Sequence, residues 1–336
     1  MKYKSVMVTE RSGPDRMQIV EQELQPPAQG EVTLKVLAAP VCGPDIQARY
    51  GQTPIVPKTP FIPGYAVIGE VHAVGKASSP DQTKVKVGQR FAALTIFGGY
   101  AEYISIPIDE LIPVPESLDP GEAVTLVLNY IVAYQTLRRS ARVKTGESIL
   151  IIGASGGVGT AYLDLGRMMG LNIYAIASRQ KFNILEDFGA TPIDYRSQDF
   201  VEVLQKAEPG GLDAVFDGMI YGYLDEGFKL LKRGGVWVQY GNPLSFKGLL
   251  SLLGRVIWFN LRPDGRKLKI YGTTTSKFGR NNYLQDWEEL FKLLEDGKIH
   301  PIIHQKFPLL EAARANALLE SGEVVGNVVL LSPDLL

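Results

Sequence analysis

The chain has 336 residues, 45% of them hydrophobic and 21% charged, which is ordinary for a soluble globular protein of about two domains. Its formal net charge is −1, so no overall field draws it to nucleic acid, and we expect no nucleic-acid partner. Cys42 is the single cysteine and there are three histidines, which excludes an internal disulfide and a four-thiolate zinc site.

The first 120 residues alternate short β-like runs with glycine and proline, which predicts a compact, mostly β domain. We expect its strands at residues 32–38, 67–74, 90–95 and 100–106. Near Pro120 the pattern changes, and residues 123–139 carry apolar side chains at helical spacing.

From Ser148 onward, predicted strands alternate with predicted helices. The strands are expected at residues 148–152, 172–177, 212–216 and 236–240, with a late edge strand at 269–272. The helices between them are expected at residues 157–169, 181–188 and 223–231. This alternation predicts a doubly wound parallel sheet with helices on both faces. The C-terminal part should hold helices at 284–296 and 311–321 and a last strand at 327–331.

A glycine-rich turn joins the first of these strands to its helix, in the sequence Gly153-Ala154-Ser155-Gly156-Gly157-Val158-Gly159. Glycines are needed where the backbone approaches a pyrophosphate and where helix packs closely on strand, and the exposed N–H groups then hold the phosphates. Because a buried strand precedes the turn and a helix follows it, we predict a dinucleotide site rather than a plain turn. Ala154 replaces the first glycine of the usual fingerprint.

The end of the second strand distinguishes between the two nicotinamide dinucleotides. An NAD site usually has an acidic residue there, about 20 residues after the turn, to bind the ribose hydroxyls. This chain has no carboxylate at that point and carries Ser178, Arg179 and Lys181 instead. Arg179 and Lys181 could simply be solvated residues at a helix start, but with the acid absent they predict binding of a 2′-phosphate, and hence NADPH. Tyr195, a few residues after the helix expected at 181–188, offers the phosphate a further hydroxyl.

Several segments occur in the order and spacing of one known family. They are Cys42-Gly43-Pro44-Asp45, Pro63-Gly64-Tyr65, Val87-Gly88-Gln89-Arg90, Gly98-Gly99-Tyr100-Ala101-Glu102, the glycine turn, and Gly326-Asn327-Val328-Val329-Leu330. On these segments the chain resembles the medium-chain dehydrogenase/reductase superfamily over nearly its full length, on the zinc-independent quinone oxidoreductase branch. Leu128-Asn129-Tyr130-Ile131 also resembles the vesicle amine transport protein homologues.

The resemblance implies an α/β fold of two domains. A GroES-like, mostly β domain would be built from both chain ends, residues 1–122 and 275–336, and a Rossmann domain with a doubly wound parallel sheet would span 123–274. The family places its active site in the cleft between the domains. It also implies a homodimer, often joined through the late edge strand, here near residues 269–274.

The resemblance also implies a reaction without zinc. Zinc alcohol dehydrogenases of this family bind their metal through a cysteine at the position of Cys42 and through a Gly-His-Glu segment, where this chain has Gly64-Tyr65-Ala66. Cys42 alone cannot replace the three protein ligands of a catalytic zinc, so we expect no metal site and interpret Cys42 as a small buried hydrophobe. Without a Lewis acid, the remaining chemistry is hydride donation from NADPH to an acceptor that is already electrophilic.

Reduction of an enone also requires a proton at the α-carbon. Tyr65 and Tyr50 are the tyrosines nearest the expected cleft and are candidate donors, as is solvent, although we favour for each a role as aromatic wall. Asp45 is a candidate acid or base, but an aspartate near a turn more often caps backbone N–H groups.

Four further residues are candidates for the nicotinamide half of the cofactor. Asn129 lies in the helix that the family turns toward the cleft, Gly241 and Asn242 follow the strand at 236–240, and Asn327 stands where relatives often have Lys or Asn. Val132 replaces a threonine of many relatives, so that contact is in doubt here.

Residues 244–263 form an amphipathic stretch that includes Lys247, Arg255, Trp258 and Phe259. The stretch follows a strand end, where open α/β sheets have their ligand clefts, so we predict a helical insertion that roofs the substrate site and favours a bulky, apolar acceptor. Two alternatives stay open: a helix packed on the Rossmann core or at a dimer face, and an interfacial helix on a membrane. The run is short and holds few cations, so we expect no membrane contact.

The predicted function is therefore an NADPH-dependent reductase of a quinone or an α,β-unsaturated carbonyl. One alternative is an enoyl-thioester reductase, which should carry a basic cluster for a carrier phosphate at the cleft mouth, and none is obvious. Another is a non-catalytic NADPH-binding protein with a sensor, structural or membrane-associated role. The N-terminus has no apolar stretch typical of a signal peptide, and we expect a cytoplasmic protein.

Overall fold

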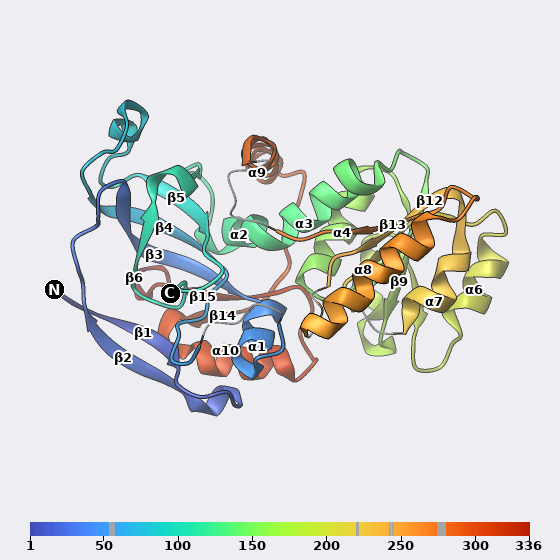
Figure 1. Ribbon diagram of the computed structural model, residues 1–336, viewed down its shortest axis with the longest axis horizontal. Coiled ribbons are helices and arrows are strands. Elements are labelled where there is room, and N and C mark those ends of the chain that lie inside the picture. The colour runs from blue at the N-terminus through green and yellow to red at the C-terminus, as the bar shows by residue number, and fades with distance from the viewer. Residues whose placement is uncertain (54–57, 220–221, 242, 244, 274–279) are drawn as a thin grey trace. The chain divides into compact units, whose positions relative to one another are not determined.

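The structure is a computed structural model that describes residues 1–53, 58–219, 222–241, 243, 245–273 and 280–336 (Figure 1). The chain divides into two compact units. The first, which we call the β unit, comprises Met1–Ile131, Thr274–Lys298 and Ile303–Leu336, and the second, the α/β unit, comprises Val132–Thr273 and Ile299–Ile302. The sequence placed the first division at 122/123. The structure places it after Ile131, because helix α2 (Pro120–Thr125) and the π-helical turn Leu126–Tyr130 pack on strands of the β unit.

The β unit is built around a seven-stranded sheet drawn from both ends of the chain. Its order is β14-β15-β3-β4-β5-β7, with β6 paired to β3. The strands are β3 (Glu31–Val41), β4 (Ala66–Val74), β5 (Arg90–Leu94), β6 (Tyr103–Pro107), β7 (Ile112–Pro113), β14 (Ile303–Pro308) and β15 (Asn327–Leu331). A separate hairpin joins β1 (Lys2–Val8) to β2 (Met17–Glu23), and the helices are α1 (Gly43–Tyr50), α2, α9 (Arg280–Glu295) and α10 (Ala312–Glu320).

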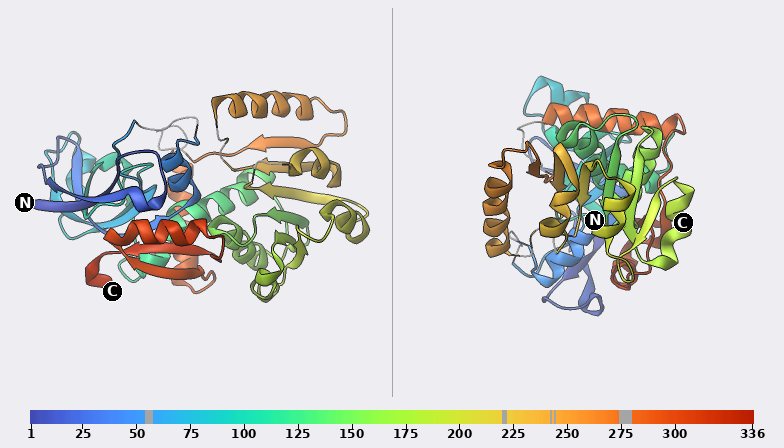
Figure 2. Two further views of the ribbon diagram at one scale, coloured as in Figure 1. Left: turned by 90° about the horizontal axis from the view of Figure 1, so that it is seen from below. Right: turned by 90° about the vertical axis from the view of Figure 1, so that its right-hand side faces the viewer.

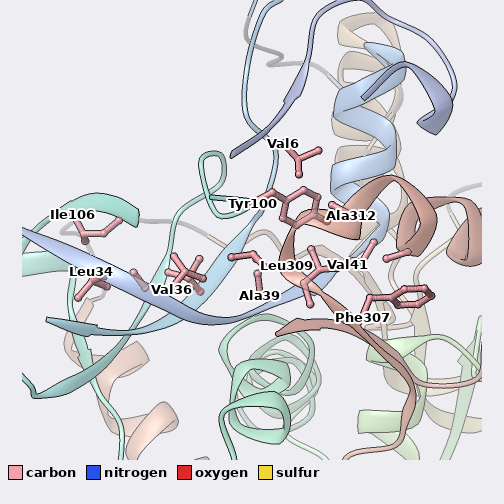
Figure 3. Close-up of a cluster of buried hydrophobic side chains, with 14 of the residues drawn as sticks. Val6, Leu34, Val36, Ala39, Val41, Tyr100, Ile106, Phe307, Leu309 and Ala312 are labelled. Atoms are coloured by element: carbon pink, nitrogen blue, oxygen red, sulfur yellow. The ribbon is translucent and has the colours of Figure 1, made fainter. Parts of the chain in front are cut away.

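One hydrophobic core holds this unit together, and Figure 3 shows part of it. Along β3 the inward side chains follow the two-residue period of a strand through Leu34 and Val36, and then change phase to Ala39 and Val41. The change coincides with an irregularity in the pairing of β3 with β4 between Val36 and Ala38, as a β-bulge produces. The bulge lets a long strand keep apolar residues on the core side along its whole length.

The α/β unit contains a six-stranded sheet in the order β10-β9-β8-β11-β12-β13, in which every described pairing is parallel. The strands are β8 (Ser148–Ile152), β9 (Asn172–Ala177), β10 (Thr191–Asp194), β11 (Leu212–Asp217), β12 (Leu231–Gln239) and β13 (Lys267–Ile270). The helices are α3 (Ile131–Gln135), which begins at the unit boundary, α4 (Gly157–Met168), α5 (Phe182–Asp187), α6 (Phe200–Ala207), α7 (Tyr223–Gly227) and α8 (Phe246–Asn260). Helices cover both faces of the sheet (Figure 2), which confirms the doubly wound parallel sheet expected from the sequence.

Helix α8 lies along β13 on one face of this sheet (Figures 1 and 2). Leu252 and Phe259 are the buried members of the helix, and the Phe259 ring lies 4.2 Å from the ring of Phe228, centroid to centroid. The Asn260 side chain closes the C-terminal end by donating to Leu268 O and accepting from Leu268 N, each at 2.9 Å. The helix therefore packs on the core of the α/β unit, which was one of the alternatives considered for residues 244–263.

Strand β13 forms one edge of the described sheet, and the predicted pairing of a second copy near residues 269–274 stays a prediction, with 274 outside the described residues. Within the described part of the chain, no helix combines the length and the apolar character needed to cross a bilayer.

Candidate functional site

The glycine-rich turn stands at the carboxyl end of β8 and leads directly into α4. Gly153 has a φ of +84°, which favours glycine, and α4 begins at Gly157. A Cβ on Gly159 would lie 2.3 Å from Gly153 O, so glycine alone allows the helix to approach the turn this closely. A Cβ on Gly156 would lie no nearer than 3.7 Å to its first neighbour, Gly153 O, so the outer side of the turn has room.

The predicted phosphate-binding residues of this turn occupy different positions. The N–H groups of Gly157 and Val158 belong to the first turn of α4, where helical N–H groups lack acceptors within the helix and attract anions. Ala154 instead is fully buried and donates its N–H to Ile176 O at 3.3 Å, so it holds β8 and β9 together. Ser155 accepts a hydrogen bond from Lys181 Nζ at 3.4 Å, which links the turn to the end of β9.

The end of β9 lies beside the end of β8, since Ile152 pairs with Ile176. Ser178 is buried there, Arg179 is exposed, and Lys181 is partly buried. Burial and, after it, the nearby charge of Arg196 lower the pKa of Lys181. All three predicted 2′-phosphate contacts thus lie at the end of β9, Lys181 contacts the glycine turn, and a third cation, Arg196, lies near Lys181.

Arg196 is a residue that the sequence analysis missed. It directly follows Tyr195, whose ring lies 5.4 Å below the guanidinium carbon and whose hydroxyl accepts from Arg196 Nε at 3.2 Å. In the sequence, the only sign of its role was that it follows Tyr195. In the fold, β10 pairs with β9, and this pairing brings Arg196 to the strand end that carries Arg179 and Lys181. Tyr195 is 47% exposed, so its hydroxyl is presented at the surface beside a cation.

Asp194 is a carboxylate near Arg196 and Arg179, and its oxygens accept two hydrogen bonds from its own turn. They accept from Arg196 N at 3.1 Å and from Ser197 Oγ at 2.8 Å. The Ser197 hydroxyl, the Arg196 N–H and the charges of Arg196 and Arg179 hold the pKa of Asp194 below its ordinary value. Asp194 therefore supports its own turn through these hydrogen bonds, and its negative charge lies near Arg196 and Arg179.

The four residues predicted for the nicotinamide half fall in both units. In the α/β unit Gly241 donates its N–H to Asp217 O at 3.3 Å, just beyond β12, while Asn242 lies outside the described residues. In the β unit the buried Asn129 and Asn327 meet, with Asn129 Nδ2 donating to Asn327 Oδ1 at 2.6 Å. Asn129 belongs to the π-helical turn Leu126–Tyr130, a kind of irregularity that often marks functional positions.

Asp45 in the β unit is buried and surrounded by donors. It accepts from Cys42 N at 3.1 Å, Cys42 Sγ at 2.9 Å, Gly64 N at 2.9 Å and Tyr100 OH at 3.0 Å. Burial raises its pKa, while the hydrogen bonds from Cys42, Gly64 and Tyr100 act to lower it. Asp45 thus caps backbone N–H groups, which the sequence analysis gave as the alternative to a role as acid or base. The hydrogen bond from Tyr100 was not expected from the sequence.

The two candidate tyrosines lie in different surroundings. Tyr50 is 40% exposed at the end of α1, and its hydroxyl donates to Glu320 Oε2 at 3.4 Å. Glu320 also forms an ion pair with the buried Arg49. Tyr65 is partly buried, and its carbonyl accepts the N–H groups of Thr95 and Ile96 at 2.9 and 3.1 Å.

Cys42 is buried, and burial raises the pKa of its thiol well above the ordinary value. Within the residues that the structure describes, no three His, Cys, Asp or Glu side chains gather as a set of metal ligands.

Comparison with known proteins places these features in a family. Residues 28–116 match the alcohol dehydrogenase GroES-like domain, and residues 188–330 match the family described as zinc-binding dehydrogenase. The synaptic vesicle membrane protein VAT-1 homolog of Rattus norvegicus is 30% identical over 343 residues, which cover 98% of this chain and 84% of the relative. The chain belongs to the medium-chain dehydrogenase/reductase superfamily.

Other members share the full length of the chain. Human quinone oxidoreductase is 28% identical over 334 residues, covering 98% of this chain and 97% of the relative. A mycobacterial protein solved in complex with NADPH has a TM-score of 0.82 at 26% identity, covering 98% of this chain and 99% of that one. The human VAT-1 homolog-like protein has a TM-score of 0.83 at 24% identity, which shows the shared fold. The GroES-like and Rossmann domains expected from the sequence are thus confirmed, and the protein is an oxidoreductase of this superfamily.

Proposed function

We propose that this dehydrogenase/reductase is an NADPH-dependent reductase that works without zinc and transfers hydride to a quinone or an α,β-unsaturated carbonyl. The observation that carries the proposal is the group of cations at the ends of β9 and β10. Arg179, Lys181 and Arg196 stand there with the hydroxyl of Tyr195, and a nearby carboxylate, Asp194, accepts hydrogen bonds from its own turn. A 2′-phosphate complements this group, whereas the diol of NADH lacks the charge to use it.

The glycine turn fits the other phosphates of the cofactor. The room beside Gly156 and the first N–H groups of α4 suit a pyrophosphate, and Gly159 keeps the helix close enough to present them. When bound, NADPH supplies the hydride, and the chain's residues hold and orient it. Gly241, Asn242, Asn129 and Asn327 remain the predicted contacts of the nicotinamide half.

The absence of a zinc requirement follows from the residues beside Cys42. The segment Gly64-Tyr65-Ala66 offers neither histidine nor glutamate, and the neighbouring carboxylate, Asp45, already accepts four hydrogen bonds. A catalytic zinc takes three protein ligands and an open position, which this donor set does not provide. The acceptor must then be electrophilic without metal activation, as quinones and enones are. The proton comes from Tyr65, Tyr50 or solvent, and we do not assign it to Asp45.

The first test is a fluorescence titration of the EDTA-treated, full-length protein with NADPH and, separately, with NADH. We expect NADPH to bind at least tenfold more tightly, a difference of about 1.4 kcal/mol. Equal affinities for the two cofactors would contradict the role given to the cations. A panel of quinones and enones then follows NADPH oxidation at 340 nm, and binding without oxidation by any acceptor would favour the non-catalytic alternative.

A further inference from the structure

The turn that carries Asn129 departs from regular α-helical geometry. Leu126–Tyr130 is π-helical, and the N–H of Ile131 bonds back to the carbonyl of Leu126, five residues earlier rather than four. Such a turn is wider than an α-helical one, so the side chains within it point in directions that a continuous α-helix would not give them. The orientation of Asn129 therefore depends on the contacts that keep this turn π-helical.

A buried indole on α9 is bonded to the turn. Trp287 donates its Nε1–H to the carbonyl oxygen of Val127 at 3.2 Å, and both residues are buried. The indole lies on the buried face of α9 with Leu290 and Phe291, three and four residues later. The ring of Tyr283 lies 5.4 Å from the indole ring, centroid to centroid. The packing of α9 thus fixes the direction of the indole N–H, and a carbonyl inside the π turn gains a side-chain donor.

The same turn is also bonded to β15. Asn129, two residues after Val127, donates from Nδ2 to Asn327 Oδ1 at 2.6 Å, and the two side chains are only 6% and 2% exposed. The bond fixes the plane of the Asn129 amide, and the amide carbonyl oxygen is an acceptor of the kind that a nicotinamide carboxamide N–H requires. Trp287, Val127, Asn129 and Asn327 all belong to the β unit.

We propose that Trp287 is a positioning residue for the nicotinamide ring, which acts by holding the π turn so that the Asn129 amide keeps its orientation. Without the indole N–H, the buried carbonyl of Val127 loses this donor, and the turn can relax toward α-helical spacing and rotate Asn129 relative to Asn327. The inference rests on the proposed function, because it assumes that Asn129 contacts the nicotinamide half of NADPH.

The test compares two ligands of the full-length protein. One is NADPH, and the other is 2′-phosphoadenosine 5′-diphosphoribose, which is NADPH without its nicotinamide ring. Trp287→Phe should weaken NADPH binding about tenfold and change the affinity for the truncated ligand by less than about twofold. The emission of bound NADPH measures the first affinity, and displacement of NADPH measures the second.

Trp237→Phe is the matched control. Trp237 is also fully buried, but its Nε1 has no hydrogen-bond acceptor among the residues that the structure describes. The control should therefore change the affinity for either ligand by less than about twofold. Replacement of Trp287 by 3-benzothienylalanine keeps the bicyclic ring and removes only the N–H, so it tests the hydrogen bond even if Trp287→Phe fails to fold. It should give the same selective loss of NADPH affinity.

Asn129→Ala tests whether the indole acts through the asparagine. If it does, Trp287→Phe should change NADPH affinity by less than about twofold in a protein that already carries Asn129→Ala, because the side chain that the turn orients is gone.

Three results would overturn the proposal. Equal loss of affinity for both ligands in Trp287→Phe would indicate a general structural role. Unchanged NADPH affinity with 3-benzothienylalanine at position 287 would exclude the hydrogen bond as the cause. A tenfold effect of Trp287→Phe that persists in Asn129→Ala would exclude Asn129 as the intermediary. Failure of the unaltered protein to bind NADPH would instead overturn the proposed function, and this inference with it.

Discussion

Two groups of polar residues in this protein differ in where their hydrogen-bonding capacity is directed. In the α/β unit, the glycine turn and the cations Arg179, Lys181 and Arg196 gather at the strand ends, where Arg179 is exposed and Lys181 partly buried, and we call them the open group. In the β unit, Asp45 is enclosed by donors from Cys42, Gly64 and Tyr100. Both groups contain titratable side chains at positions that the family resemblance emphasises, so position alone does not separate a binding role from a structural one. The two roles are separated by whether the hydrogen-bonding groups are directed at one another, as around Asp45, or at a surface that a ligand can approach.

The largest effect on the glycine turn and on cofactor binding is expected from a methyl group added at Gly159. Because its Cβ would lie 2.3 Å from Gly153 O, Gly159→Ala must push α4 away from the turn. We expect a loss of about 2–3 kcal/mol in unfolding free energy, typical of overpacking, and at least about 100-fold weaker NADPH binding. Urea denaturation and cofactor titration measure the two effects.

Gly156→Ala is the matched control for that variant. The space beside Gly156 accepts a Cβ in the free protein, so stability should change by less than about 1 kcal/mol. NADPH binding should still weaken, because the methyl group occupies the side on which a pyrophosphate would lie. Unchanged NADPH binding in Gly156→Ala would place the phosphates elsewhere.

Substitutions in the enclosed hydrogen-bond network of Asp45 should lower the stability of the protein and leave its affinity for NADPH unchanged. Asp45→Leu strands the buried N–H groups of Cys42 and Gly64, and each unsatisfied donor costs about 1–3 kcal/mol. We expect a loss of about 3 kcal/mol in urea denaturation, with Tyr100→Phe costing about 1 kcal/mol. A tenfold change in the NADPH dissociation constant of Asp45→Leu, with the fold intact, would contradict this assignment.

Substitution of the cations should change the preference of the protein for NADPH over NADH. Arg196→Ala and Arg179→Ala should each weaken NADPH binding by about tenfold or more, since hydrogen bonds to charged groups contribute about 1.5–3 kcal/mol. NADH affinity should not change, because it lacks the 2′-phosphate. Lys206→Ala, on the exposed face of α6, is the control and should alter neither affinity.

The smallest expected effect is a pH dependence of NADPH affinity. Burial and Arg196 lower the pKa of Lys181, so its positive charge is lost at a lower pH than in an ordinary lysine. NADPH binding should therefore weaken as pH rises through the alkaline range, by less than about tenfold, while NADH binding stays level. Arg196→Ala should move the onset to higher pH, and titrations between pH 7 and 10 would detect the shift.

The sequence predicted the repeating part of the fold well. Strands at 148–152, 172–177 and 327–331 were predicted with the bounds that the structure has, because apolar runs in buried parallel strands are bounded by glycine or polar turns. The hairpin of β1 and β2, the strand β14 and the helices α1 and α6 were not predicted. Strands β2 and β14 mix exposed polar residues with few inward ones, and such strands are defined by their partners rather than by their own periodicity.

The candidate site was predictable where function depends on consecutive residues. The glycine turn and the Ser178–Lys181 stretch could be identified from local order, but Arg196 required knowledge that β10 lies beside β9. The same limit applies to Asn129 and Asn327, whose side chains form a hydrogen bond although they are 198 residues apart in the sequence. The enclosure of Asp45 depends on Tyr100, which is distant in sequence, so only the three-dimensional structure distinguishes capping from catalysis there.

The pairing of β15 with β3 has a consequence for the protein's synthesis. Residues 38–41 of β3 form their ladder with residues 328–331, and all the strands of the α/β unit lie between these two segments in the sequence. During synthesis, this part of β3 therefore remains an open strand edge until β15 has emerged, whereas the strands of the α/β unit can pair with one another before that. A nascent chain of this protein is most exposed to mispairing at β3, and deletion of residues 327–331 would leave that edge open permanently.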